Sequence, residues 1–193
     1  MLLASQSESR QALLAAAGIP FEAIASGIDE RRVEASLRGA SGAEVAAHLA
    51  RAKAQAVAAR HPGRLVLGAD QTLDFEGRVF AKPATRAEAR AQLLGFSGKT
   101  HRLNSALCLM RDETVLFAAV VPARLTCRAF TAEFVDRYMA AAGDDALKSV
   151  GAYQVEGLGI HLFEKIEGDH ATILGLPLLP LLAYLRNENL VAE

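Results

Sequence analysis

Residues 64–83 read RLVLGADQTLDFEGRVFAKP, and this stretch predicts more about the fold than any other. Its first half, 64–70, is a run of aliphatic residues that ends at Asp70, which is typical of a strand buried on both faces. Residues 72–81 alternate around a Glu-Gly turn and predict a β-hairpin. A carboxylate at the end of a buried strand is where α/β sheets place their chemistry, although Asp also caps turns.

Helical patterns lie on both sides of this stretch. The capping-box sequences Ser41–Glu44 and Thr85–Glu88 predict helices that extend to about Arg60 and Leu94. Near the N-terminus we expect a short buried strand at 1–4, a Ser-rich loop, a helix ended by Gly18 and an extended segment at 20–26. The remaining predicted elements are strands at 101–110, 114–127 and 159–166 and helices at 131–142 and 177–187. These patterns predict one α/β domain with a mixed sheet over residues 1–193.

The composition excludes several classes of protein. Hydrophobic residues make up 51% of the 193 residues, so a disordered chain is excluded. The formal net charge of −1 argues against a nucleic-acid partner held by bulk charge. Aromatic residues are only 6% and Trp is absent, which predicts an aliphatic core. The longest apolar run is broken by Pro177 and Pro180 and falls short of the roughly 20 residues that a membrane span needs, so we expect no membrane partner.

The cysteines and the N-terminus predict a cytoplasmic protein. Cys108 and Cys127 form no CxxC motif, and we interpret them as buried thiols in a reducing cytosol. The N-terminal MLLASQSESR has no basic region before its apolar residues, so it does not resemble a signal peptide.

The common catalytic signatures are absent. Residues 97–100 read SGKT, but Leu93 stands where a P-loop needs its first glycine, and the segment follows a predicted helix rather than a strand. No HExxH, GxSxG or GxGxxG motif occurs. The histidines show no metal-ligand spacing, and we expect His101 to be structural.

Polar residues near element ends remain as candidates, each with a plainer alternative. Residues 5–10, SQSESR, combine hydroxyls and a guanidinium at a helix start, where an anion can bind; the alternative is an ordinary N-cap with a solvated Arg10. Lys53 lies among alanines on a predicted helix, where a solvated lysine is the default. Lys82 precedes a proline and is otherwise expected to be exposed. Glu156 lies among glycines that suit either a ligand or a tight turn.

Six stretches in order resemble the Maf family of nucleoside triphosphate pyrophosphatases. They are LASQSESRQALLAAAGIPF (3–21), GIDE (27–30), HLARAKAQAVA (48–58), VLGADQTLDFEGRVFAKP (66–83), LLGFSGKTHRLNSALCL (93–109) and VGAYQVEGLGIHLFEKIEGDHATILGLPLLPL (150–181). The resemblance implies an inosine-triphosphatase-like fold, with an elongated mixed β-sheet, flanking helices and a central cleft. It also implies hydrolysis of a nucleoside triphosphate to the monophosphate and diphosphate, and a possible homodimer.

The resemblance also implies roles for individual residues. Asp70 matches the proton acceptor of the family, and Glu30 and Asp70 match acidic positions of a site for a divalent metal cation, Mg²⁺ or Mn²⁺. The positions that match its substrate pocket are Ser5, Ser9, Arg10, Lys53, Gln71, Lys82 and Glu156. Ser9 departs from the family, which usually has Arg or Trp there, and Glu8 replaces its proline. Whether Asp70 acts mainly as a base or as a metal ligand stays open.

Gln71 and Glu156 match the subgroup that prefers 7-methyl-GTP, whereas the dTTP and UTP subgroup has Thr and Gln at these positions. A carboxylate can accept hydrogen bonds from both donors of a guanine edge, which supports this interpretation. The alternatives are a dTTP/UTP pyrophosphatase, an inosine or xanthosine triphosphatase, and a nucleotide-sensing regulator of cell division that binds without turnover.

Overall fold

The computed structural model describes residues 1–191, and the chain divides into two compact units. Unit 1 comprises residues 1–71, 104–122 and 169–193, and unit 2 comprises residues 72–103 and 123–168. The strands are β1 (Leu2–Leu3), β2 (Glu22–Ala23), β3 (Leu65–Phe75), β4 (Arg78–Phe80), β5 (Thr100–Arg111), β6 (Thr114–Cys127) and β7 (Phe163–Glu167). The α-helices are α1 (Glu8–Ala16), α2 (Glu30–Ser36), α3 (Gly42–Ala58), α4 (Arg86–Phe96), α5 (Ala132–Ala142), α6 (His170–Ile173) and α7 (Leu178–Asn187), and the 3₁₀ helices are η1 (Gly143–Leu147) and η2 (Leu158–Leu162).

The strands form a mixed sheet in the order β2-β1-β3-β5-β6-β7, with β4 paired to β3. β1 runs parallel to both β2 and β3, whereas the pairs β3–β4 and β6–β7 are antiparallel. The predicted α/β architecture with a mixed sheet is therefore confirmed. In the part of the chain that the structure describes, no helix is long and apolar enough to cross a membrane.

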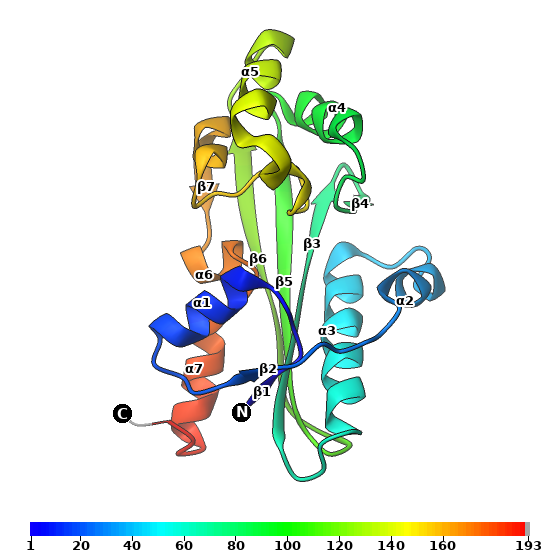
Figure 1. Cartoon of the computed structure of the whole chain (residues 1–193), viewed down its shortest axis with the longest axis vertical. Coiled ribbons are helices and arrows are strands. Elements are labelled where there is room, and N and C mark those ends of the chain that lie inside the picture. The colour runs from blue at the N-terminus through cyan, green and yellow to red at the C-terminus, as the bar shows by residue number, and fades with distance from the viewer. Residues whose placement is uncertain (192–193) are drawn as a thin grey trace. The chain divides into compact units, whose positions relative to one another are not determined.

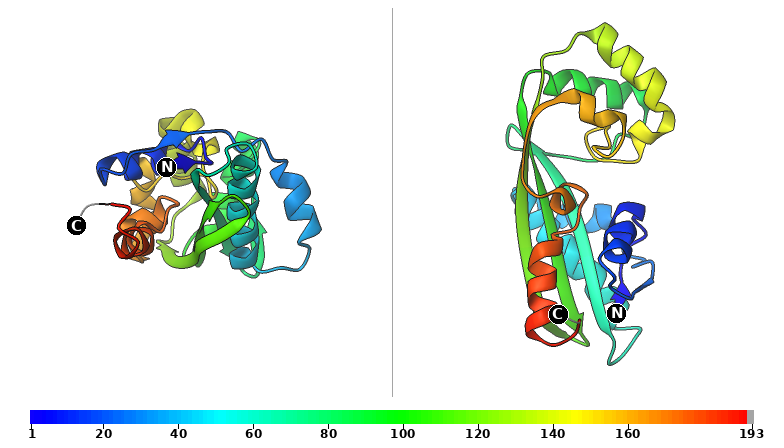
Figure 2. Two further views of the ribbon diagram at one scale, coloured as in Figure 1. Left: turned by 90° about the horizontal axis from the view of Figure 1, so that it is seen from below. Right: turned by 90° about the vertical axis from the view of Figure 1, so that its left-hand side faces the viewer.

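The strands of unit 1 have an aliphatic layer on each face. Leu2, Val66 and Cys108 pack with the alanines of α3, whereas their neighbours Leu3, Leu67 and Leu107 pack with residues of α1 and α7. This division follows from the period of two along a strand, which sends successive side chains to opposite faces. Accordingly, α3 and α7 lie on opposite sides of these strands (Figures 1 and 2).

Unit 2 has a more aromatic interior than the composition predicts. The rings of Phe75, Phe96 and His101 follow one another at centroid distances of 5.0 and 4.9 Å, and Tyr153 and Phe163 pack at 4.8 Å. The prediction of an aliphatic core is therefore right for unit 1 and wrong for unit 2. The composition of the whole chain gave a wrong prediction for unit 2, because the few aromatic residues concentrate in that unit.

The prediction that a strand ends at Asp70 is wrong. β3 continues to Phe75, and Asp70 lies at the middle of its 11 residues. The strand continues because Thr72 and Leu73 are also buried. The predicted strand at 159–166 is wrong in its first half, where the chain forms η2 before β7.

The capping residues near the starts of α3 and α4 predicted these helix starts correctly. Ser41 and Glu44 form the predicted capping box at the start of α3. At α4, Thr85 caps the backbone of Glu88 as expected, but the Glu88 carboxylate accepts from the backbone of Ala84 rather than from Thr85. The pattern at Thr85 therefore forms only half of the expected box.

Candidate functional site

A buried lysine joins two acidic residues in unit 1. The Lys53 ammonium on α3 lies 2.6 Å from Oδ1 of Asp70 on β3 and 2.9 Å from Oε2 of Glu30, the first residue of α2. The side chains of Lys53 and Asp70 are only 8% and 9% exposed, whereas that of Glu30 is 49% exposed. The interpretation of Lys53 as a solvated residue is therefore wrong, because its helix face turns toward β3.

Gly68 explains how α3 comes close enough to β3 for this contact. A Cβ atom at Gly68 would lie 2.1 Å from the Ala50 carbonyl oxygen and 2.7 Å from the Ala54 backbone nitrogen. Only a residue without a side chain allows the helix backbone to pack there. Asp70 is two residues further along β3 and therefore points to the same face, toward Lys53.

Arg10 on α1 is held by two hydrogen bonds. Its Nε donates to the Gly175 carbonyl at 2.8 Å, and its Nη1 donates to Ser5 Oγ at 3.2 Å. Ser5 Oγ also accepts from the backbone of Ser7. Ser7, the N-cap of α1, makes no side-chain capping bond. The alternative of an ordinary N-cap with a solvated Arg10 is therefore wrong, because the loop and Arg10 are joined through Ser5.

Charge and burial act together on Asp70. Burial raises the pKa of the Asp70 carboxyl above its ordinary value, since it disfavours the charged form, and Lys53 and Arg10 oppose this rise. Burial lowers the pKa of the Arg10 guanidinium, while Asp70 and Glu30 raise it. These couplings place Arg10, Glu30, Lys53 and Asp70 in one group, and Ser5 joins it through its hydrogen bond to Arg10. We call these five residues the charged cluster.

Sequence reasoning missed one acidic residue near this cluster. Desolvation, followed by the charges of Asp70 and Glu30, raises the pKa of Glu34, and Lys53 and Arg31 oppose the rise. Glu34 lies one turn after Glu30 on α2, a helix that was not predicted because its segment has no apolar periodicity. The spacing of four residues between Glu30 and Glu34 was the only sequence signal that could have identified Glu34 as a neighbour of Glu30.

Gln71 follows Asp70 but makes different contacts. Its amide nitrogen donates to Ser105 Oγ and to the carbonyls of Thr172 and Ile173. These partners come from β5 and α6, and nothing in their local sequence identifies them.

The other predicted site residues are not part of these contacts. Ser9 lies on the first turn of α1, partly buried. Lys82 follows β4 and Glu156 lies in a turn; both belong to unit 2 and are exposed. Their roles in substrate binding stay predictions.

His101 has the structural environment that we expected. It is buried in unit 2, and its Nε2 lies 2.6 Å from the Tyr153 hydroxyl. Burial lowers the pKa of His101 to about 4, so the imidazole is neutral at pH 7.

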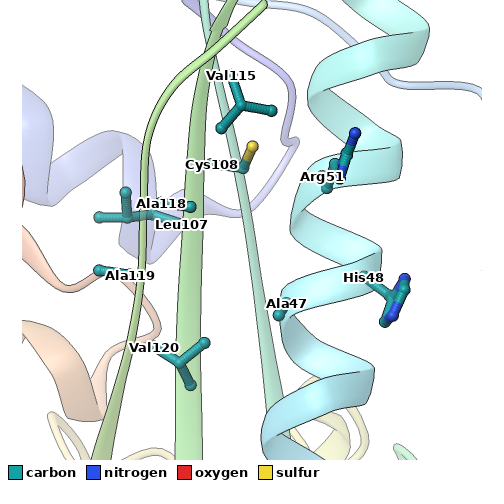
Figure 3. A pocket seen from close by; sticks show the side chains of 9 residues that line it. All are labelled: Ala47, His48, Arg51, Leu107, Cys108, Val115, Ala118, Ala119 and Val120. Atoms are coloured by element: carbon teal, nitrogen blue, oxygen red, sulfur yellow. The ribbon is translucent and has the colours of Figure 1, made fainter.

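A pocket of about 340 Å³ lies elsewhere in unit 1, between α3, β5 and β6 (Figure 3). It is lined mainly by small apolar side chains and by Cys108, with His48 and Arg51 on its helical side. None of its lining residues belongs to the charged cluster. Cys108 and Cys127 are buried free thiols, as predicted.

The predicted metal site has two protein ligands, the carboxylates of Glu30 and Asp70. Within residues 1–191, no group of three or more His, Cys, Asp or Glu side chains is arranged to hold a metal ion. Glu30 and Asp70 nevertheless converge on one point, the Lys53 ammonium. Two carboxylates suit Mg²⁺ or Mn²⁺, which commonly take the rest of their ligands from water and substrate phosphates.

Comparison with known proteins identifies a family that the chain matches. The family described as "Maf-like protein" matches residues 1–188. Among relatives, the nucleoside triphosphate pyrophosphatases of Rhodopseudomonas palustris (strain BisB18) and Nitrobacter winogradskyi are 57% and 54% identical, each over 100% of this chain and 95% of the relative. The 7-methyl-GTP pyrophosphatase of Brucella suis biovar 1 is 53% identical over 99% of this chain and 97% of the relative.

Proposed function

The chain belongs to the Maf family, and on that premise we propose that it is a nucleoside triphosphate pyrophosphatase, a hydrolase of phosphoric anhydride bonds. The observation that carries this proposal is the buried Asp70–Lys53 pair with Glu30 and Arg10 around it. A triphosphate carries about four negative charges, so its cleavage needs cations at the phosphates and a carboxylate to activate water.

The residues of the charged cluster have complementary roles in this reaction. Asp70 accepts the proton of the attacking water, whose oxygen forms a bond to the α-phosphorus. The bond from that phosphorus to the bridging oxygen breaks, and pyrophosphate leaves with the electron pair. The charge of Lys53 favours the ionised form of Asp70, since it opposes the rise in pKa that burial causes. Arg10, with Ser5, offers donors to the phosphate oxygens, because its two bonds use only two of its five N–H groups.

We propose that Glu30 and Asp70 also hold a divalent cation, Mg²⁺ or Mn²⁺. Such an ion supplies positive charge that withdraws electron density from the phosphates. The two carboxylates fit this use, and water and the substrate would complete the coordination. Activity should disappear in EDTA and return with either metal; full activity in EDTA would contradict this part of the proposal.

The proposed activity is tested by incubating the protein with Mg²⁺ and a set of triphosphates and measuring pyrophosphate. The set is 7-methyl-GTP, GTP, dTTP, UTP, ITP and XTP. We expect release of pyrophosphate from at least one of them. Tight binding without turnover of any would instead favour the nucleotide-sensing regulator.

We propose 7-methyl-GTP as the preferred substrate. Glu156 can accept two hydrogen bonds from the guanine edge, and N7 methylation gives the base a positive charge that favours an anionic partner. Against uracil or thymine, the carboxylate would meet carbonyl oxygens. The relative from Brucella suis named for this substrate supports the choice.

The variant Glu156→Gln tests this preference. It should lower kcat/KM for 7-methyl-GTP and raise it for UTP, changing their ratio about 5- to 150-fold, because a polar mismatch that the bound base covers costs about 1–3 kcal/mol. Glu164→Gln, an exposed residue of β7, is the matched control in the same unit. An unchanged substrate ratio in Glu156→Gln would show that base preference arises elsewhere.

A further inference from the structure

The segment that carries Glu156 is a tight turn of unit 2. Residues 151–157, which we call the Glu156 loop, lead into η2. The backbone nitrogen of Gly157 donates to the Gln154 carbonyl at 3.2 Å. A Cβ atom at Gly159, in η2, would lie only 2.4 Å from the Gln154 carbonyl oxygen, so the close return of the chain requires glycine there. The backbone around Glu156 is therefore held in one conformation by the chain on both sides of it.

The start of the Glu156 loop has a strained backbone. Ala152 has a φ of 63°, in the left-handed region that residues with a Cβ seldom adopt. It is fully buried, and its carbonyl accepts from the Tyr138 hydroxyl of α5 at 3.1 Å. Strain of this kind persists only where surrounding contacts hold it, and it is commonly found beside functional residues. The strained residue lies four positions before Glu156.

Tyr153 fastens this loop to the interior of unit 2. Its side chain is buried, and its ring packs on Phe163 of β7 at a centroid distance of 4.8 Å. Its hydroxyl lies 2.6 Å from Nε2 of His101 on β5. Because Tyr153 is only three residues before Glu156, this hydrogen bond sets where the Glu156 loop leaves the interior.

Packing alone does not explain a histidine at position 101. The imidazole is 2% exposed and lies against the rings of Phe96, Tyr153 and Phe163. Within residues 1–191, its Nδ1 has no hydrogen-bond partner. A buried polar atom without a partner destabilises the folded state, and an apolar side chain would avoid that penalty. What the imidazole adds over an apolar side chain is its hydrogen bond with the Tyr153 hydroxyl.

We infer that His101 and Tyr153 are positioning residues, whose hydrogen bond holds the Glu156 loop so that the Glu156 carboxylate meets the base of the substrate. This inference rests on the proposed function, in which Glu156 sets base preference. His101 and Tyr153 act through Glu156 and touch no substrate. Loss of their bond should therefore weaken discrimination between bases and leave phosphate binding by the charged cluster unchanged.

Tyr153→Phe tests the bond, because it removes the hydroxyl and keeps the ring. We would measure kcat/KM for 7-methyl-GTP and UTP with wild type, Tyr153→Phe, Glu156→Gln and the double variant. Tyr153→Phe should change the ratio of the two values roughly threefold to tenfold, in the same direction as Glu156→Gln, which is the scale of one net hydrogen bond. In the Glu156→Gln background it should have less than about a twofold effect, since residues that act through one group are not additive.

The matched control is Tyr184→Phe, which removes a hydroxyl from α7 in unit 1 and should leave the substrate ratio unchanged. Two further measurements separate positioning from a general loss of structure. The affinity for inorganic tripolyphosphate with Mg²⁺, a probe without a base, should be unchanged in Tyr153→Phe. Hydrogen exchange at the Gly157 amide should become roughly fivefold to tenfold faster, because the loop opens more readily without the bond. Exchange in α3, which belongs to unit 1, should not change.

Four results would each overturn the inference: an unchanged substrate ratio in Tyr153→Phe, an additive effect in the double variant, unchanged exchange at Gly157, or an equal loss of tripolyphosphate affinity. If wild type releases pyrophosphate from no triphosphate, the proposed function is contradicted. The ratio of affinities for 7-methyl-GMP and UMP, which needs no turnover, then replaces the kinetic ratio. If Tyr153→Phe does not fold, as judged by circular dichroism, Tyr138→Phe removes the bond to the Ala152 carbonyl and should shift the ratio in the same direction. An unchanged ratio in that variant would also overturn the inference.

Discussion

Asp70 and Lys53 form a buried pair in which each residue changes the chemistry of the other. Burial alone would favour a neutral carboxyl, and Lys53 and Arg10 counteract it. A carboxylate whose pKa is raised above its ordinary value is a stronger base and is suited to accept a proton. This balance is a property of the folded chain, since residues 53 and 70 come from a helix and a strand.

Asp70→Asn should lower kcat about 10²- to 10⁴-fold, the range typical for loss of a general base. The amide is similar in shape but cannot accept the proton of water, so nucleotide binding should survive. Asp74→Asn, on the same strand, is the control and should keep its activity. Steady-state pyrophosphate release and nucleotide affinity are the measurements; near wild-type turnover in Asp70→Asn would remove it from the mechanism.

His101 gives a prediction about stability. Its pKa is about 4 in the folded protein and 6.5 ordinarily, so the unfolded chain binds a proton first as the pH falls. Stability is therefore present above pH 6.5 and lost progressively between pH 6.5 and 4, by about 3 kcal/mol in total. His101→Gln should remove most of this slope in urea unfolding measured at several pH values. The exposed His48→Gln should retain it, and an equal slope in His101→Gln would contradict the assignment.

At the scale of elements, the close packing of α3 on β3 positions the charged cluster. Leu2, Ala4, Val66 and Cys108 share one apolar layer with the alanines of α3. The glycine at position 68 lets the two backbones meet, and Lys53 and Asp70 then face each other. Small residues on both elements therefore help to position the site, although none of them belongs to the charged cluster.

Gly68→Ala should destabilise the protein by about 1–3 kcal/mol, because the added methyl group overlaps the Ala50 carbonyl oxygen. It should also reduce activity, since α3 carries Lys53. Gly95→Ala on α4 is the matched control. Apart from its chain neighbours and the adjacent backbone of α4, no atom of the described residues lies within 4 Å of its Cβ position, so the change should be neutral or stabilising by up to about 1 kcal/mol. Urea unfolding measures both, and equal effects would refute the packing argument.

The elements also show where sequence reasoning was sufficient. The start of α3 was predictable because Ser41 and Glu44 cap it locally. The hairpin at 72–81 was also predictable, and β3 and β4 form it. That its first arm continues the strand of Asp70 without a break was not, since this depends on what covers Thr72 and Leu73. Asp70 and Arg10 were identified from local patterns and from family resemblance. The carbonyls that hold Arg10 and Gln71 belong to residues 172–175, which only tertiary structure brings to them.

At the scale of the whole molecule, the charged cluster belongs to one unit. Ser5, Arg10, Glu30, Lys53 and Asp70 all come from the first 71 residues, within unit 1, whereas Lys82 and Glu156 belong to unit 2. The proposal therefore assigns phosphate chemistry to residues of unit 1 and base preference to Glu156 of unit 2. Substitutions in the charged cluster should lower turnover, whereas substitution of Glu156 should change the ratio of kcat/KM between substrates.

In the proposed reaction, water attacks the α-phosphorus and pyrophosphate leaves. The most direct test is hydrolysis of 7-methyl-GTP in ¹⁸O-labelled water, with the products separated and weighed by mass spectrometry. We expect equal amounts of nucleoside monophosphate and pyrophosphate, with one ¹⁸O atom in the monophosphate and none in the pyrophosphate. Nucleoside diphosphate with labelled orthophosphate, or the label in pyrophosphate, would contradict it.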